Sequence, residues 1–167
     1  MVKKLVLSIL FSIALVACQK KQQADSIIHN ATVYSFDSEF SITQAIVIKD
    51  GIIIAIGDNE SILSKYSGKK INVNGRFIFP KFNLKLDSIR KIIINSIDNY
   101  NQETSLRTPI SNQLKIYFKD YSPLEINQPA SLNIVNLTKS PFHPIETWLH
   151  GEVIYNIHLS RNYPISF

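Results

Sequence analysis

Cysteine is almost absent from this chain of 167 residues, which contains only Cys18. A single cysteine cannot close an intrachain disulfide, so a disulfide-stapled fold is excluded. Glycine is also scarce, at five residues. None of the five belongs to a phosphate-cradling loop or to the Gly-x-Ser-x-Gly elbow of serine hydrolases. Nucleotide binding through such a loop and hydrolysis through such an elbow are therefore not expected.

Blocks of like charge are missing as well. The chain has 18 Lys and Arg against 13 Asp and Glu, a net charge of +5 that is spread along the sequence. No basic block with interleaved aromatic residues indicates contact with DNA or RNA. We therefore expect no nucleic-acid partner.

A run long enough to cross a bilayer, about 20 apolar residues, is also missing. The longest apolar run, residues 5–16, is broken only by Ser8 and Ser12, follows Lys3 and Lys4, and leads into Leu-Val-Ala-Cys18. That ending resembles the lipobox of bacterial lipoproteins. We therefore predict a lipoprotein signal peptide over residues 1–17 and lipidation of Cys18, with palmitate among its acyl chains, as the membrane anchor.

The residues after Cys18 extend this prediction. Gln19 follows the cysteine, and no aspartate is there to favour retention in the inner membrane. In a bacterium with two membranes, we therefore expect the protein in the cell envelope, anchored in the outer membrane. Residues 18–24 are polar after the cysteine and lack a periodic pattern, so they are predicted to be a flexible tether. Residues 25–167 are then expected to form a single domain.

The body of the chain is rich in Ile, Val and Phe and poor in Ala, which favours strands. Residues 45–57 place two β-rich runs on either side of Asp50-Gly51, which predicts a hairpin. A strand is expected over 26–34, followed later by a short helix over 61–66 capped by Asp58 or Asn59. A second tight reversal is expected at Asn74-Gly75, before a strand over 77–79 that Pro80 ends. Further strands are expected over 113–118, 131–137 and 147–155, the last with a turn at His150-Gly151.

The middle of the chain has a helical period. Apolar residues recur every three or four positions from Leu86 to Tyr100, which predicts an amphipathic helix over about 86–100. Ile89, Ile93 and Ile97 lie on its apolar stripe. We expect this stripe either to pack on the sheet or to form an interaction face for a protein partner or a second copy of the chain.

The order of the strand-forming segments resembles the metal-dependent amidohydrolases. Residues 24–34, 45–57 and 71–82 resemble the N-terminal part of that family, up to the strand that leads into the catalytic barrel. Residues 125–135 and 147–155 resemble the stretch where the family chain returns to its small β domain. The resemblance implies a mainly β fold, a β-sandwich of the amidohydrolase composite type.

The residues that carry the family's chemistry are not present. Members of the family continue through Pro-Gly-Phe to an aspartate and a His-x-His pair of metal ligands. Here Lys81 replaces the glycine, and the histidine positions fall on Leu86 and Ser88, which do not hold a divalent ion. Only Asp87 to about Pro123, roughly 35–40 residues, separates the two recognised parts, whereas a (β/α)₈ barrel takes about 250. We expect no barrel, catalytic residue, metal or cofactor.

The four histidines offer no alternative metal site by spacing. His29, His143, His150 and His158 show neither an i, i+2 nor an i, i+4 pair.

Two hypotheses follow for function. The first is a membrane-anchored, non-catalytic binding or structural module, or a degenerate remnant of a hydrolase. The alternative is a subunit of a metal-dependent hydrolase acting on C–N bonds, completed by another chain.

Overall fold

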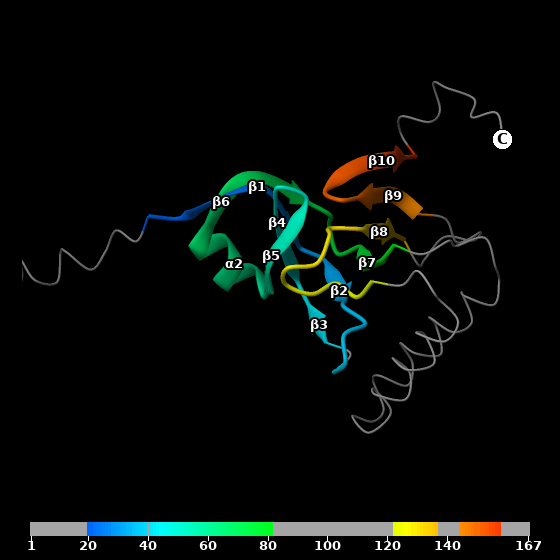
Figure 1. Cartoon of the computed structure of the whole chain (residues 1–167), viewed down its shortest axis with the longest axis horizontal. Coiled ribbons are helices and arrows are strands. Elements are labelled where there is room, and N and C mark those ends of the chain that lie inside the picture. Colours follow the sequence, from blue (N-terminus) through cyan, green and yellow to red (C-terminus); the bar gives the residue numbers. More distant parts are fainter. Residues whose placement is uncertain (1–19, 40, 82–121, 137–143, 158–167) are drawn as a thin grey trace, which may run out of the picture.

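The computed structural model describes residues 20–39, 41–81, 122–136 and 144–157, and these form a mainly β domain with one short helix, as predicted (Figure 1). In chain order the elements are β1 (Gln22–His29), β2 (Thr32–Tyr34), β3 (Ile42–Thr43), β4 (Ala45–Lys49), β5 (Ile52–Gly57), α2 (Asn59–Lys65), β6 (Tyr66–Asn72), β7 (Phe77–Pro80), β8 (Leu132–Val135), β9 (Pro144–Leu149) and β10 (Glu152–Asn156).

The strands form two sheets that share one core. The first sheet has the order β5-β4-β1-β6 and the second the order β10-β9-β8-β7-β2-β3. Both are mixed, because β1 pairs parallel with β6 and β2 pairs parallel with β7, while the other pairs are antiparallel. Side chains alternate between the two faces of a strand, so one face of each sheet supplies the shared core. Its buried members are Ile28, Ala31, Val33, Ile46, Ile48, Ile53, Val73, Ile78, Leu124, Ala130, Leu132, Ile134 and Trp148.

A second, smaller core lies on the other face of the four-stranded sheet. Helix α2 covers this face and contributes the buried Ile62. The sheet contributes Ala24, Ile27, Ala45, Val47 and Ala55. The first sheet is therefore buried on both faces, which explains why Ile46, Val47 and Ile48 of β4 are all buried in succession.

The two hairpin turns and the short capped helix that the sequence predicted are present in the structure. Asp50 and Gly51 adopt φ angles of 51° and 76°, as a type I′ hairpin turn requires, and His150 and Gly151 adopt 50° and 81°. The short helix is also present. Asp58 is its N-cap, since the carboxylate accepts a hydrogen bond from the backbone N–H of Ser61 at 2.7 Å. The helix begins at residue 59, two positions before the predicted start.

The single strand predicted over residues 26–34 is wrong. Asn30, at a φ of 53°, breaks it into β1 and β2, which belong to different sheets. The second reversal is also only partly right. Asn74 and Gly75 do form a turn, at φ angles of 53° and 74°, but β6 and β7 do not pair with each other.

The physical reason for both differences is a double crossing between the sheets. The β1–β2 and β6–β7 segments run parallel and pass together from the first sheet to the second. At the crossing the Val73 N–H donates to the His29 carbonyl at 3.1 Å, and the Gly75 N–H donates to the Asn30 carbonyl at 2.6 Å. The backbone groups exposed by the break in β1–β2 are thus paired with the other crossing segment.

The tether predicted over residues 18–24 is too long. Gln22 and Gln23 belong to β1, where they pair with Tyr66 and Ser67 of β6. The Gln23 side-chain oxygen accepts a hydrogen bond from the Ser67 hydroxyl at 2.8 Å, and Ala24 is buried in the second core. The strand extends this far because Ala24 adds apolar burial and the glutamines find partners on β6.

Several predictions fall outside the described residues. These are the signal peptide and Cys18, the strand over 113–118, and the helix over about 86–100 with Ile89, Ile93 and Ile97. In the part of the chain that the structure does describe, no helix has the length and apolar character required to cross a bilayer.

Candidate functional site

The junction between β7 and β8 is where the resemblance would place the base of a catalytic barrel. β7 ends at Pro80, and the next N–H, that of Lys81, donates to the Ser131 carbonyl at 2.9 Å. The two strands are antiparallel, with Phe77 opposite Val135 and Pro80 opposite Leu132. The part of the sequence before residue 82 and the part after residue 121 therefore meet in one sheet through the β7–β8 pair.

An aromatic cluster lies on the face of β2 and β7 opposite the shared core. Val33 and Ile78 point into that core, so their neighbours Tyr34 and Phe79 point the other way. The Tyr34 ring stacks on Phe79 at 5.2 Å and on Phe77 at 6.2 Å, and Phe36 stacks on Phe79 at 5.9 Å. Tyr34, Phe36 and Phe79 are all buried. These rings are therefore packing groups and do not form an open aromatic ligand platform.

A buried polar pair lies on the same sheet. The Thr147 hydroxyl of β9 donates to the Asn133 side-chain oxygen of β8 at 2.8 Å. Because Asn133 and Thr147 occupy facing positions in the β8–β9 register, the bond is a cross-strand contact that satisfies both groups. It stabilises the pairing and carries no reactive group.

Four carboxylates are engaged in structural hydrogen bonds. Asp37 accepts from the backbone N–H groups of residues 39 and 41, and Asp25 accepts from the N–H of Asp50 at 2.7 Å. Asp58 caps α2. Glu146 accepts from the indole N–H of Trp148 at 3.1 Å and from the side-chain amide of Asn156 at 2.6 Å. These four carboxylates hold turns and strand ends in place. The hydrogen bonds described here do not join any of them to a side chain that could act as its acid–base partner in catalysis.

The histidines are separated by the fold. His29 ends β1, and its buried Nδ1 atom has no hydrogen-bond partner within the described ranges. His150 is exposed in the β9–β10 turn, where its backbone N–H donates to the Ser131 hydroxyl at 3.3 Å. His143 and His158 lie outside the described residues. Within those that are described, no three His, Cys, Asp or Glu side chains gather as metal ligands would.

The positions singled out for site chemistry are only partly described. Lys81, which replaces the family's glycine, lies at the junction, whereas Leu86, Ser88, Cys18 and the Ile89 stripe fall outside the described residues. The aromatic cluster was not predicted from the sequence. Its signal was the alternation of Phe77, Ile78 and Phe79 in one short strand, which buries apolar groups on both faces of the sheet.

Comparison with known proteins gives no matching family profile and no matching curated protein. Among solved structures, the chain is similar to a protein from Bacillus thuringiensis, at 30% identity over 37% of this chain and 85% of that one, with a TM-score of 0.32. It is similar to an enamidase described as a member of the amidohydrolase superfamily, at 29% identity and a TM-score of 0.29. It is also similar to a zinc-bound adenosine deaminase from Xanthomonas campestris, at 14% identity and a TM-score of 0.34.

The enamidase and deaminase matches are partial on both sides. They cover 33% and 36% of this chain, and this chain spans 15% of the length of each of those enzymes. The similarity to amidohydrolase superfamily members therefore concerns about a third of the chain and only a small part of either enzyme.

Proposed function

We propose that the protein is a membrane-anchored lipoprotein whose β domain is a non-catalytic binding or structural module, of the amidohydrolase composite type but without a catalytic barrel. The observation that carries this proposal is the direct pairing of β7 with β8. These are the strands that carry the sequence motifs found on either side of the barrel in the resembling family, and here they are hydrogen-bonded neighbours.

The packing of the domain supports a module that folds without a barrel. Ile78 of β7 and Leu132 and Ile134 of β8 share one core with Ile28 and Ile46 of the first sheet. Only about 50 residues connect Lys81 to Ser131, against about 250 for a (β/α)₈ barrel. Apolar burial of this kind is the main stabilising term of a small domain, and it is present in the composite β domain itself.

Lipidation of Cys18 is tested by metabolic labelling. In bacteria that express the full chain with radiolabelled palmitate, we expect label on the wild type and complete loss of label for Cys18→Ser, since no second cysteine is present. Gln19→Asp is the matched variant. It is expected to keep the label but to move the protein from the outer-membrane fraction to the inner-membrane fraction. Label that persists in Cys18→Ser would refute the anchor.

The non-catalytic role is tested by metal content. After incubation of the purified full chain with zinc and then with manganese, we expect less than stoichiometric metal by elemental analysis, because Leu86 and Ser88 replace the histidine ligands of the family. A zinc-binding protein of known stoichiometry serves as the positive control. One bound metal per chain that His29→Asn or His150→Asn removes would contradict the proposal and favour a hydrolase subunit.

A further inference from the structure

The membrane anchor, if it forms as proposed, is attached to the domain by a very short link. β1 begins at Gln22, so only residues 19–21 separate the strand from Cys18. Four residue steps span at most about 14 Å. The ammonium group of Lys21 donates to the Leu63 carbonyl in the last turn of α2 at 2.6 Å. The link therefore leaves the domain beside the C-terminal end of α2, and that end is held close to the bilayer.

Most of the described cationic side chains gather at this same end. We call it the basic end and define it by the exposed lysines Lys20, Lys21, Lys65, Lys69 and Lys70. They are five of the eight Lys and Arg in the described residues. Asp25 of β1 lies among them, and the backbone N–H of Asp50 donates to its carboxylate at 2.7 Å, so two acidic residues lie beside the five lysines. Cationic residues that are spread along the sequence are thus brought together in space.

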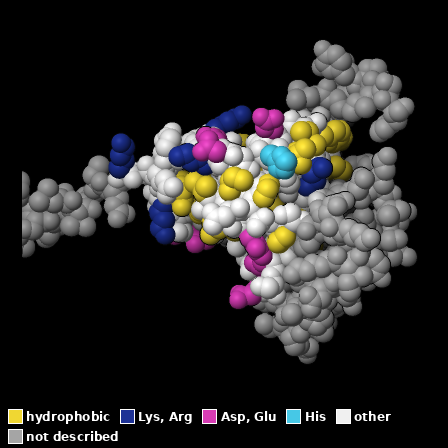
Figure 2. All heavy atoms as spheres, viewed as in Figure 1, with side chains coloured by type: hydrophobic (Ala, Val, Ile, Leu, Met, Phe, Trp, Pro, Cys, Tyr) yellow, Lys and Arg dark blue, Asp and Glu magenta, His cyan; other side chains and the backbone are white. Residues whose placement is uncertain are grey.

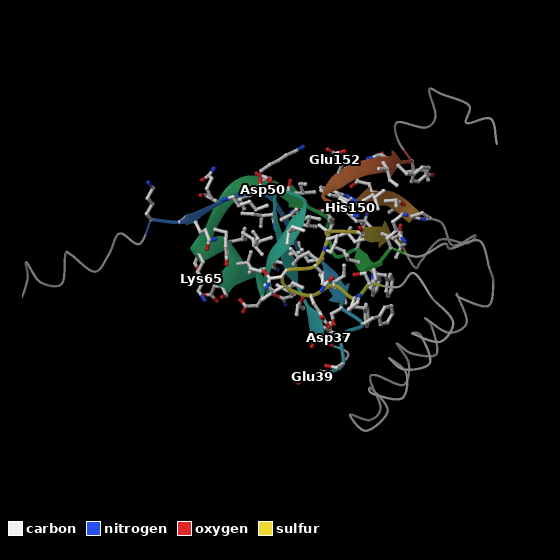
Figure 3. The ribbon with its side chains drawn as sticks, viewed as in Figure 1. Asp37, Glu39, Asp50, Lys65, His150 and Glu152 are labelled. Carbon is white, nitrogen blue, oxygen red and sulfur yellow. The ribbon has the colours of Figure 1, made fainter. Side chains whose placement is uncertain are left out.

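The figures show where these lysines lie. Figure 2 shows Lys and Arg side chains over the end of the domain from which the N-terminal segment leaves, with Asp and Glu side chains beside them. In Figure 3 Lys65 lies at that end, at the left of the view, while Asp37, Glu39 and Glu152 lie well away from it. The pairing of β1 with β6 explains the grouping, because it places Ser26 beside Lys69 and Ile27 beside Lys70.

We propose that the basic end docks on anionic phospholipid headgroups of the leaflet that holds Cys18, so that the domain has a fixed orientation on the membrane. This inference rests on the proposed lipid anchor. Charges act over a Debye length of roughly 8–10 Å at physiological salt, and the short link holds the lysines within reach of that layer. Each lysine near an anionic surface strengthens the association by about fivefold.

The test reconstitutes the full chain into vesicles of phosphatidylcholine, with and without phosphatidylglycerol, and measures amide hydrogen exchange. We expect slower exchange over residues 59–72 on the vesicles with phosphatidylglycerol, and loss of this protection at high salt. The variant Lys65→Gln/Lys69→Gln is expected to weaken the association by about thirtyfold and to lose the protection. Unchanged exchange over residues 144–156 reports that the variant is folded.

The matched control removes the same charge from other places, as Arg76→Gln/Lys81→Gln, and is expected to keep the protection. Equal exchange over residues 59–72 on the two kinds of vesicle would overturn the docking. Equal loss of protection in the control would also overturn it, since net charge rather than the basic end would then be responsible. The mass of the N-terminal peptide from the same sample reports lipidation of Cys18, so failure of the anchor is distinguished from failure of the docking.

Discussion

Gly51→Ala is expected to lower the free energy of unfolding by roughly 2–5 kcal/mol. The alanine must adopt the left-handed φ of 76° that Gly51 has in the β4–β5 turn, which costs an L-residue roughly 1–2 kcal/mol. A Cβ atom at this position would also lie 2.6 Å from the backbone carbonyl oxygen of His150. The backbone must shift to remove this clash, which costs a further 1–3 kcal/mol or so. Urea denaturation followed by the fluorescence of Trp148 measures the change.

Gly75→Ala separates these two costs. Gly75 has a nearly identical φ of 74°, but a Cβ atom there would meet no atom within 4 Å. This variant is therefore expected to lose only the conformational part, roughly 1–2 kcal/mol. Equal losses for the two variants would show that the contact between the two hairpin turns contributes nothing.

The contact matters because it joins the two sheets at one corner. The Ala130 N–H donates to the Gly51 carbonyl at 2.9 Å, and the Gly151 N–H donates to the Ala130 carbonyl at 2.9 Å. A Cβ atom on Gly151 would lie 2.8 Å from the Cα atom of Gly51. Glycine at both turns thus permits the first hairpin, the last hairpin and the segment before β8 to meet backbone to backbone.

Ile134→Ala is expected to cost roughly 2–5 kcal/mol, since truncation of a buried isoleucine removes transfer free energy and leaves a cavity. Ile134 lies on β8, is only 1% exposed, and shares its core with residues of the first sheet. If the two parts of the sequence form one cooperative unit, far-UV circular dichroism and Trp148 fluorescence will report a single transition, shifted together.

Ile154→Ala is the matched control for this variant. It makes the same chemical change on β10, where the side chain is 55% exposed, and is expected to change the stability by less than about 0.5 kcal/mol. Two separate transitions for Ile134→Ala, one from each sheet, would contradict the shared core.

The elements that the sequence predicted well are those with local causes. The Asp50-Gly51 and His150-Gly151 turns follow from residues that tolerate positive φ, and α2 follows from a capping aspartate before a short apolar pattern. Each of these signals lies within a few neighbouring residues. The pairing of two β-rich runs across a turn then follows directly.

The features that the sequence did not predict depend on contacts between distant residues. The break at Asn30 becomes necessary only because residues 73–76 cross between the sheets at the same place and supply the hydrogen-bond partners. The tether was predicted to be too long because the partners of Gln22 and Gln23 lie more than 40 positions away, on β6. The basic end combines lysines from three separate segments, which no local pattern reveals.

The candidate site divides in the same way. The substitutions at Lys81, Leu86 and Ser88 can be read from residue identity alone, because ligand chemistry depends on the side chain that is present. The aromatic cluster and the hydrogen bonds of Glu146 could not be read in this way. They depend on which strands become neighbours and on which face each residue takes.

The position of β1 in its sheet also has a mechanical consequence. This strand follows directly on the N-terminal link and has a hydrogen-bonded neighbour on each side, β4 and β6. A pull along the link therefore loads two ladders in shear, where many hydrogen bonds share the force, and does not peel an edge strand away one bond at a time. Drag on the domain would therefore reach the link, and with it the anchor that we propose at Cys18, through the part of the first sheet best able to resist it.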